Sequence, residues 1–306
     1  MAMIKNLDEL MERARNLKEK MIISVAVAED AHVLVAVNKA HEAGICEAIL
    51  VGDKEKIENI AREENIDLGK YEIIDSKDHA EAAAKAVQLV KDKKAHLLMK
   101  GKLHTSVLLK AVLNKEAGMR TGRFLSLVPF FEVPNYDRIF CITDVGIMIN
   151  PDLNQKKDII VNAVEVAHAL GLETPKVAVV GALELVNPDM PATMDAAMLA
   201  KMNDRNQIKG AIVDGPFGMD NAMSVEAAKT KGINSPVAGK ADIVIVPDIE
   251  AGNIAYKSLV FVAGAEIASV VAGAKVPIIL TSRADSEKSK MYSIALGVVY
   301  ADYLWR

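Results

Sequence analysis

The segment VPIILTSRADSEK, residues 276–288, is an apolar run that stops abruptly at Thr281, Ser282 and Arg283. A guanidinium can bind a phosphate through two parallel hydrogen bonds, and a hydroxyl can donate to the charge that develops on a reacting carbonyl. The same residues also fit a structural role, in which Ser282 caps the next helix and Arg283 pairs with a surface acid such as Asp285. From this stretch alone, the structural role is favoured.

A second polar segment is MKGKLHTS, residues 99–106, which follows an apolar run and precedes a helical pattern. Free backbone N–H groups at the start of a helix favour an anion, so this segment is a candidate phosphate site. The alternative is that Thr105 or Ser106 caps the helix while the lysines are solvated. The two interpretations fit the segment equally well. Its polar residues are Lys100, Lys102, His104, Thr105 and Ser106.

A third segment, VPDIEAGNIAYK, residues 246–257, carries Asp248, Gly252 and Asn253 where a strand should end and a helix begin. We favour a structural role for these residues, because Asp, Gly and Asn are standard residues of such turns. The preceding Gly239–Lys240 pair is not a P-loop, since it stands before a strand. A GxGxxG dinucleotide motif is also absent from the sequence.

The composition excludes several classes of protein. The chain has 306 residues and a formal net charge of -4, without a basic block, so nucleic acid is not an expected partner. No uninterrupted apolar run reaches the length of a membrane span, and no secretory signal is evident, so we expect a cytoplasmic protein. Two cysteines, Cys46 and Cys141, form neither a disulfide framework nor a metal-ligand pattern.

The hydrophobic pattern alternates between short apolar runs and longer segments of helical spacing, which predicts an α/β fold with largely parallel sheets. Two neighbouring strand-like runs, 123–131 and 138–149, predict an antiparallel hairpin. The other expected strands are 22–27, 47–52, 71–74, 95–99, 176–180, 210–213, 242–246 and 276–280. We expect two domains, one of residues 1–135 plus 285–306 and the other of residues 136–284.

The chain closely resembles the phosphate acetyltransferase/phosphate butyryltransferase family, and within it the butyryltransferase branch. The resemblance covers nearly the whole chain, and its segments are specific together although each is weak alone. They are KGKLHTSVLLKAVLNKEAGMRTGR, ITDVGIMINPDLNQK, VDGPFGMDNA, SPVAGKADIVIVPDIEAGNIAYK and TSRADSEKSKMYSIALG.

The resemblance implies reversible acyl transfer, butyryl-CoA plus phosphate giving butyryl phosphate plus CoA, by direct attack in a ternary complex. CoA is then a substrate, and neither a metal nor a bound cofactor is expected. The implied fold is two α/β domains with an interdomain cleft, like the isocitrate and isopropylmalate dehydrogenases, assembled as a homodimer or larger homo-oligomer. The alternatives are phosphate acetyltransferase activity, a metal- and nucleotide-dependent dehydrogenase on the same fold, and a non-catalytic binding protein.

The resemblance also implies roles for residues. A serine that stabilises the tetrahedral intermediate and an arginine that binds phosphate match Ser282 and Arg283. The family's proposed base for the CoA thiol is an aspartate seven positions beyond this serine, where the present chain has Ser289. Asp285 and Glu287 are the nearest carboxylates, and we take Asp285 as the candidate base.

A second phosphate-binding arginine of the family falls near Lys110, which keeps the charge but loses the bidentate fork. Arg120 and Arg123 are nearby candidates to compensate. Together with residues from the polar segments above, the expected substrate-binding residues are Lys100, Lys102, His104, Thr105, Lys110, Arg120, Arg123, Asp248, Gly252 and Asn253.

Overall fold

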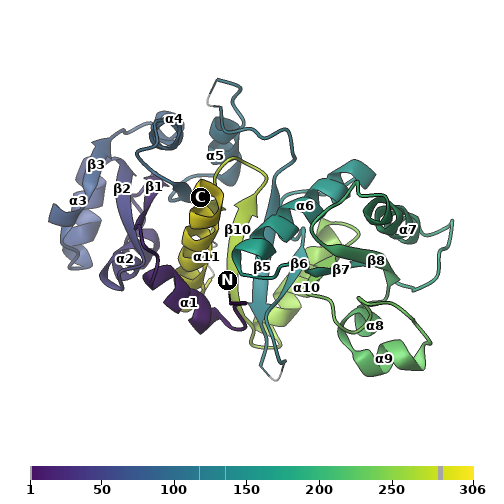
Figure 1. Cartoon of the computed structure of the whole chain (residues 1–306). Coiled ribbons are helices and arrows are strands. Elements are labelled where there is room, and N and C mark those ends of the chain that lie inside the picture. Colours follow the sequence, from purple (N-terminus) through teal and green to yellow (C-terminus); the bar gives the residue numbers. More distant parts are fainter. Residues whose placement is uncertain (1, 117, 135, 282–284) are drawn as a thin grey trace. The chain divides into compact units, whose positions relative to one another are not determined.

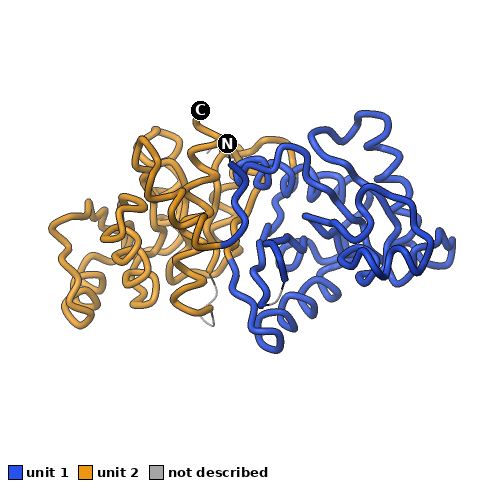
Figure 2. The backbone as a smooth tube through the Cα atoms, turned by 60° about the horizontal axis from the view of Figure 1, so that its bottom comes forward, with its two compact units in different colours: residues 1–6, 124–267 blue, residues 7–123, 268–306 orange. Residues whose placement is uncertain are grey.

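The computed structural model of the chain describes residues 2–116, 118–134, 136–281 and 285–306 (Figure 1). The chain forms two compact units, unit 1 of residues 1–6 and 124–267 and unit 2 of residues 7–123 and 268–306 (Figure 2). These divisions fall at 123/124 and 267/268, whereas the sequence analysis expected about 135 and 284. Both strands of the expected hairpin therefore belong to one unit.

Unit 2 is built on a parallel sheet whose strands are apolar over most of their length. The burial of almost every residue of β1 and β2 indicates that helices cover both faces of the sheet. One strand, β10, is antiparallel to its neighbour β11, and most of β10 lies in this unit. The strand order is β3 (Glu72–Asp75), β2 (Cys46–Gly52), β1 (Met21–Ala26), β4 (Leu97–Lys100), β11 (Ile278–Ile279) and β10 (Glu266–Ala272).

The helices of unit 2 divide into two groups by their contacts. One group packs with α11 (Glu287–Trp305) and consists of α1 (Leu7–Arg15) and α2 (Ala31–Glu42), with α3 (Lys54–Glu63) beside α2 (Figure 1). The other group is α4 (His79–Lys91) and α5 (Thr105–Val112), which pack against each other. A 3₁₀ turn, Leu68–Lys70, precedes β3.

Helix α11 is buried on all sides over much of its length, from Ser289 to Ala301. A helix that is apolar around its whole circumference belongs in a core. Here the core is formed by α1 and α2 together with β1, β4 and β11. The last helix of the chain is therefore a central element of unit 2.

The strands of unit 1 are also mostly parallel. The order is β5 (Ser126–Glu132), β6 (Phe140–Thr143), β9 (Ile243–Ile245), β7 (Lys176–Val180) and β8 (Ile212–Phe217). Strands β5 and β6 pair antiparallel, with Phe130 opposite Cys141, which confirms the predicted hairpin. Helices α6 (Leu153–Ala169) and α7 (Pro191–Asp204) pack together, and α8 (Met219–Met223), α9 (Val225–Thr230) and α10 (Ile249–Phe261) complete the unit.

The predicted α/β class with largely parallel sheets is confirmed, but one strand was missed. Strand β10 follows α10 closely, and its EIASVVA sequence mixes small and β-branched residues without a clear alternation. Gly264, with φ of 69°, lies between the helix and the strand. In the structure the segment is a strand, with Val271 antiparallel to Ile278.

Asp144 organises the turn after β6 in unit 1. Its carboxylate is 2% exposed. It accepts the backbone N–H groups of Gly146 at 2.9 Å, Met148 at 3.0 Å, Ile147 at 3.2 Å and Leu127 at 3.4 Å. Burial raises the pKa of Asp144, while these N–H donors act in the opposite direction. One buried side chain thus accepts hydrogen bonds from four backbone N–H groups, and buried N–H groups need such a partner.

We predict that Asp144→Ala lowers the free energy of unfolding of unit 1 by about 3 kcal/mol or more, because buried N–H donors lose their acceptor. Urea denaturation followed by circular dichroism measures the change. Asp189→Ala, at an exposed position of the same unit, is the control. Equal midpoints for the two variants would contradict the role given to Asp144.

Candidate functional site

The carboxyl ends of β4 and β11 lie at the same edge of the sheet in unit 2. The two strands are parallel neighbours, with Ile279 opposite Met99. The segment after β4 begins at Gly101, and the segment after β11 begins at Leu280. In open α/β sheets this edge is where ligands bind. The pairing therefore brings together two of the polar segments selected from the sequence.

Ser282 and Arg283 lie outside the described residues, so their assigned roles remain predictions. The residues on either side are described: Thr281 is 8% exposed, and Asp285 is half-buried. The cap of α11 is Ser286, whose hydroxyl accepts the N–H of Ser289 at 3.0 Å. The alternative in which Ser282 caps this helix is therefore wrong.

The candidate carboxylates near this segment differ in their surroundings. Glu287 is exposed and forms an ion pair with Lys39 of α2, which places it in a surface contact. Ser289, at the position where the family has an acid, is buried and belongs to the helix cap. Asp285 precedes the cap and is half-buried. It differs from Glu287, which is exposed, and from Ser289, which has no carboxylate.

Lys290 is a residue that the sequence analysis missed. Its side chain is nearly fully buried, at 5% exposure for the residue, and its ammonium donates to the backbone carbonyl of Asp285. No local signal marks it, because the neighbouring charged residues Glu287 and Lys288 of the same turn are exposed. A buried positive charge thus lies beside the segment that precedes the helix.

The turn after β4 is fixed against the end of β1 by a close backbone approach. Gly101 donates its N–H to the Ala26 carbonyl at 2.8 Å, and Lys102 donates to the Val27 carbonyl at 2.7 Å. A Cβ on Gly101 would lie 1.9 Å from the Val27 carbonyl oxygen, so this position requires glycine. Val27 itself has a φ of 58°, a strained conformation for a β-branched residue.

The start of α5 differs from the capped helix that the alternative interpretation of MKGKLHTS assumed. The N-cap residue is His104, whose side chain caps no backbone N–H among the described residues. Thr105 and Ser106 lie inside the helix. The alternative in which either one caps α5 is therefore wrong, and the first N–H groups of α5 are available to an anion.

The basic residues of this region occupy different environments. Lys100 is half-buried, with its ammonium 3.3 Å from the Gly101 carbonyl oxygen and 3.4 Å from that of Leu103. Lys102 and His104 are exposed. Lys100 thus helps to hold the turn, while the other two present their side chains to solvent.

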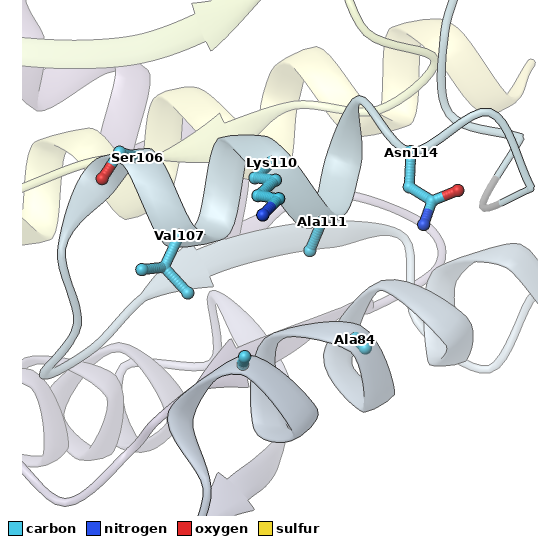
Figure 3. Close-up of a pocket in the computed structure, with 7 residues that line it drawn as sticks. Ala84, Ser106, Val107, Lys110, Ala111 and Asn114 are labelled. Carbon is cyan, nitrogen blue, oxygen red and sulfur yellow. The ribbon is translucent and has the colours of Figure 1, made fainter.

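The remaining basic candidates lie further along the chain. Lys110 is exposed on α5 and lines a groove of about 400 Å³ between α4 and α5 (Figure 3). Arg120 is exposed and forms a backbone bridge with Ala274. Arg123 is half-buried, and its N–H donates to the Thr121 hydroxyl at 3.2 Å. All three belong to unit 2, as do the residues after β4 and β11.

Asp248, Gly252 and Asn253 belong to unit 1, where each has a structural contact. Asp248 caps α10 by accepting the N–H of Ala251 at 2.8 Å. A Cβ on Gly252 would lie 2.6 Å from the Asp144 carbonyl oxygen, and Asn253 donates to the Val145 carbonyl at 3.2 Å. These contacts agree with the structural role favoured for this segment, and a role in substrate binding remains a prediction.

A second buried charge that the sequence analysis missed is Glu29, which follows β1 and is 2% exposed. One carboxylate oxygen accepts the N–H of Asp53 at 3.3 Å, and the other lies 3.6 Å from Nε2 of His79. A Cβ on Gly52 would lie 2.1 Å from this carboxylate, so a side chain at residue 52 would displace Glu29. Glu29 thus fixes the turn between β2 and α3.

Both cysteine side chains are buried. Burial raises the pKa of the Cys46 thiol to about 12 and raises the pKa of Cys141 well above its usual value. A thiol with a raised pKa is a poor nucleophile at neutral pH, because the thiolate is the reactive form. The surroundings of these two thiols therefore do not favour covalent catalysis.

The described residues contain no group of three or more His, Cys, Asp or Glu side chains placed to hold a metal ion. Among the same residues, no helix combines the length and the apolar character needed to cross a membrane.

Comparison with known proteins finds relatives over almost the full length of the chain. A phosphate acetyltransferase of Thermotoga maritima is 52% identical over 295 residues, 96% of this chain and 99% of the relative. A phosphate butyryltransferase of Clostridium acetobutylicum is 48% identical over 299 residues, 98% of this chain and 99% of the relative.

Solved structures give the same result for the fold. A branched-chain phosphotransacylase from Enterococcus faecalis is 33% identical, with a TM-score of 0.81 over 92% of this chain and 99% of that one. A 4-hydroxythreonine-4-phosphate dehydrogenase from Klebsiella pneumoniae is 15% identical, with a TM-score of 0.56 over 94% of this chain and 99% of that one. The second likeness concerns the fold alone, and it supports the expected dehydrogenase-like architecture.

A family model described as phosphate acetyl/butaryl transferase matches residues 6–85 and 79–298. These matched ranges include the segments after β4 and after β11. With this match and the full-length relatives, the chain belongs to the phosphate acetyl/butyryl transferase family of acyltransferases.

Proposed function

We propose that this acyltransferase moves a short-chain acyl group, with butyryl preferred, between CoA and inorganic phosphate. Family membership over nearly the whole chain carries the proposal. In the forward direction a phosphate oxygen attacks the acyl carbon of butyryl-CoA, the carbon–sulfur bond breaks, and butyryl phosphate and CoA are released. The same fold hosts dehydrogenases, but membership of an acyltransferase family favours acyl transfer over that alternative.

The proposed phosphate site lies at the carboxyl edge of unit 2. Arg283 supplies a bidentate contact, and Lys102 with the first N–H groups of α5 supplies further positive potential. The parallel pairing of β4 with β11 supports this grouping, because the two strands end at one edge of the sheet. The charge of phosphate is thereby balanced before the reaction begins.

Ser282 is proposed to donate a hydrogen bond to the oxyanion that forms on the acyl carbon. In the reverse direction the CoA thiol must lose its proton, and Asp285 is proposed to accept it. The half-buried position of Asp285 supports this choice over the surface-paired Glu287. We also propose direct transfer in a ternary complex, without an acyl-enzyme, a metal or a bound cofactor. The homodimer or larger oligomer remains a prediction.

The preference for butyryl is the finer part of the proposal, since the full-length relatives include both acetyl- and butyryltransferases. We predict that, with phosphate present, CoA thiol is released from butyryl-CoA with a kcat/KM at least about 30-fold higher than from acetyl-CoA, since the two additional methylenes contribute about 1–3 kcal/mol each in an apolar pocket. Isobutyryl-CoA tests branched chains, and a reaction without phosphate is the control. A kcat/KM for acetyl-CoA equal to or above that for butyryl-CoA would refute the preference.

Arg283→Ala is expected to raise the KM for phosphate or abolish turnover, with a loss of about 100-fold in kcat/KM, because a charge-assisted contact to the reacting group is removed. Arg283→Lys should be intermediate, since it keeps the charge without the fork. The control is Arg205→Ala, an exposed arginine at the end of α7. Steady-state kinetics with the circular dichroism spectrum of each variant checks the assignment, which fails if folded Arg283→Ala has wild-type kinetics.

The Cys46→Ala/Cys141→Ala double variant should keep the wild-type kcat, because neither buried thiol is needed for direct transfer. In the native protein both thiols should resist iodoacetamide at pH 8 and should react after unfolding, because burial raises their pKa. Mass spectrometry of the wild-type enzyme, after incubation with butyryl-CoA in the absence of phosphate, tests independently for an acyl adduct. An acyl adduct on either cysteine would refute direct transfer.

A further inference from the structure

The groove between α4 and α5 has the chemistry of a small binding site. It encloses about 400 Å³, within the usual range for a ligand pocket. Most of its walls are small and apolar, and no acidic residue is among the described residues that line it. Its lining residues are Ala80, Ala84, Ser106, Val107, Lys110, Ala111 and Asn114.

The groove opens at the same edge of the sheet as the proposed reacting centre. Helix α4 follows β3 and helix α5 follows β4, so both helices begin at the carboxyl edge of parallel strands. Ala80 and Ser106, in the first turns of the two helices, form this end of the groove. From Ser106 to Ala111 the groove extends roughly 8 Å along α5. A ligand bound at the sheet edge can therefore continue into the groove.

Lys110 supplies the single positive charge among the described lining residues. Figure 3 shows Val107, Lys110 and Ala111 on the side of α5 that faces α4, with the lysine nitrogen directed toward the space between the helices. Lys110 lies in the last turn of α5, away from the helix N-terminus where inorganic phosphate is proposed to bind. Its position therefore suits a second anionic group on the same ligand.

The apolar part of the groove suits a flat ring. Ala80 and Ala84 are exposed on α4 and carry only methyl groups, so no large side chain fills the space opposite α5. Val107 and Ala111 provide a matching apolar wall. Ser106 and Asn114 add hydrogen-bonding groups near the two ends. Adenine, joined to phosphates, matches this combination of apolar walls, few polar groups and one cation.

We propose that this groove binds the nucleotide end of CoA, with the adenine between α4 and α5 and a phosphate of the nucleotide on Lys110. The inference rests on the proposed function, because that function makes CoA the long anionic substrate whose thiol must reach the sheet edge. It assigns Lys110 to the nucleotide and not to inorganic phosphate, so the two assignments predict different kinetic effects.

Two variants test the groove. Lys110→Met removes its charge, and Ala84→Phe fills its apolar part without disturbing a buried position. Each should raise the KM for butyryl-CoA about tenfold, as expected for the loss of one charge-assisted contact or of ring burial, and should change the KM for phosphate less than about twofold. With butyryl-pantetheine, which lacks the nucleotide, the KM of Ala84→Phe should stay within about twofold of wild type.

Matched controls lie just outside the groove. Lys115→Met removes an exposed lysine shortly after α5, and Gln88→Phe adds the same bulk one turn further along α4. Both should keep the wild-type KM for butyryl-CoA. An increase in the phosphate KM alone for Lys110→Met, or an equal penalty with butyryl-pantetheine for Ala84→Phe, would overturn the proposal.

A binding measurement separates this inference from the proposed function. Adenosine 3′,5′-bisphosphate should bind the wild-type chain in calorimetry, and its affinity should fall about tenfold in Lys110→Met and Ala84→Phe. If wild-type protein released no thiol from any acyl-CoA, the proposed function would fail while this measurement still reported on the groove. Absence of nucleotide binding, or equal binding by wild type and both variants, would overturn the groove assignment.

Discussion

The parallel alignment of β1, β4 and β11 is the constraint on which the proposed site depends, because it places three strand ends at one edge of the sheet in unit 2. The alignment leaves little space between the turns that follow. Gly101 lies so close to the Val27 carbonyl that a Cβ would be 1.9 Å from it. The turn after β4 therefore depends on the position of β1, and any side chain at residue 101 would displace the polar residues that come next.

Burial of α11 adds a second constraint at the same edge. The helix is enclosed by α1, α2 and the sheet, and its start is fixed by the Ser286 cap. Thr281 is buried on one side of residues 282–284, and the Asp285 carbonyl accepts the buried Lys290 ammonium on the other. The described residues on either side of 282–284 therefore make buried contacts. Such contacts matter for the proposed acyl transfer, since a displacement of about 1 Å in a catalytic group can cost about 100-fold in rate.

Periodicity predicted the parallel strands and the β5–β6 hairpin, because a buried strand and a tight turn leave local signals. It missed β10, although β10 and β11 are consecutive antiparallel strands, because EIASVVA lacks a clear alternation and closely follows α10. The local sequence also did not show that Ser286, and not Ser282, caps α11. It gave no sign that Lys290 and Glu29 are buried. The choice of Ser282 and Arg283 came from family resemblance, since the isolated stretch favoured capping. Sequence reasoning therefore identified two polar segments whose strands end at one edge of the sheet, while the roles of individual residues there remain predictions.

The relatives include both acetyltransferases and butyryltransferases, and this difference has a physical interpretation. Acetyl- and butyryl-CoA share the nucleotide, the pantetheine arm, the thioester and the phosphate co-substrate, and they differ only in two methylenes. A scaffold that fixes the shared groups can be retained while a few apolar contacts around the acyl chain change, at about 1–3 kcal/mol for each methylene. Relatives at 52% and 48% identity can therefore differ in acyl preference without differing in the sheet edge or in the groove beside Lys110. Family membership therefore indicates that CoA carries the acyl group and that phosphate accepts it. The preferred length of the acyl chain depends instead on the volume of one apolar pocket.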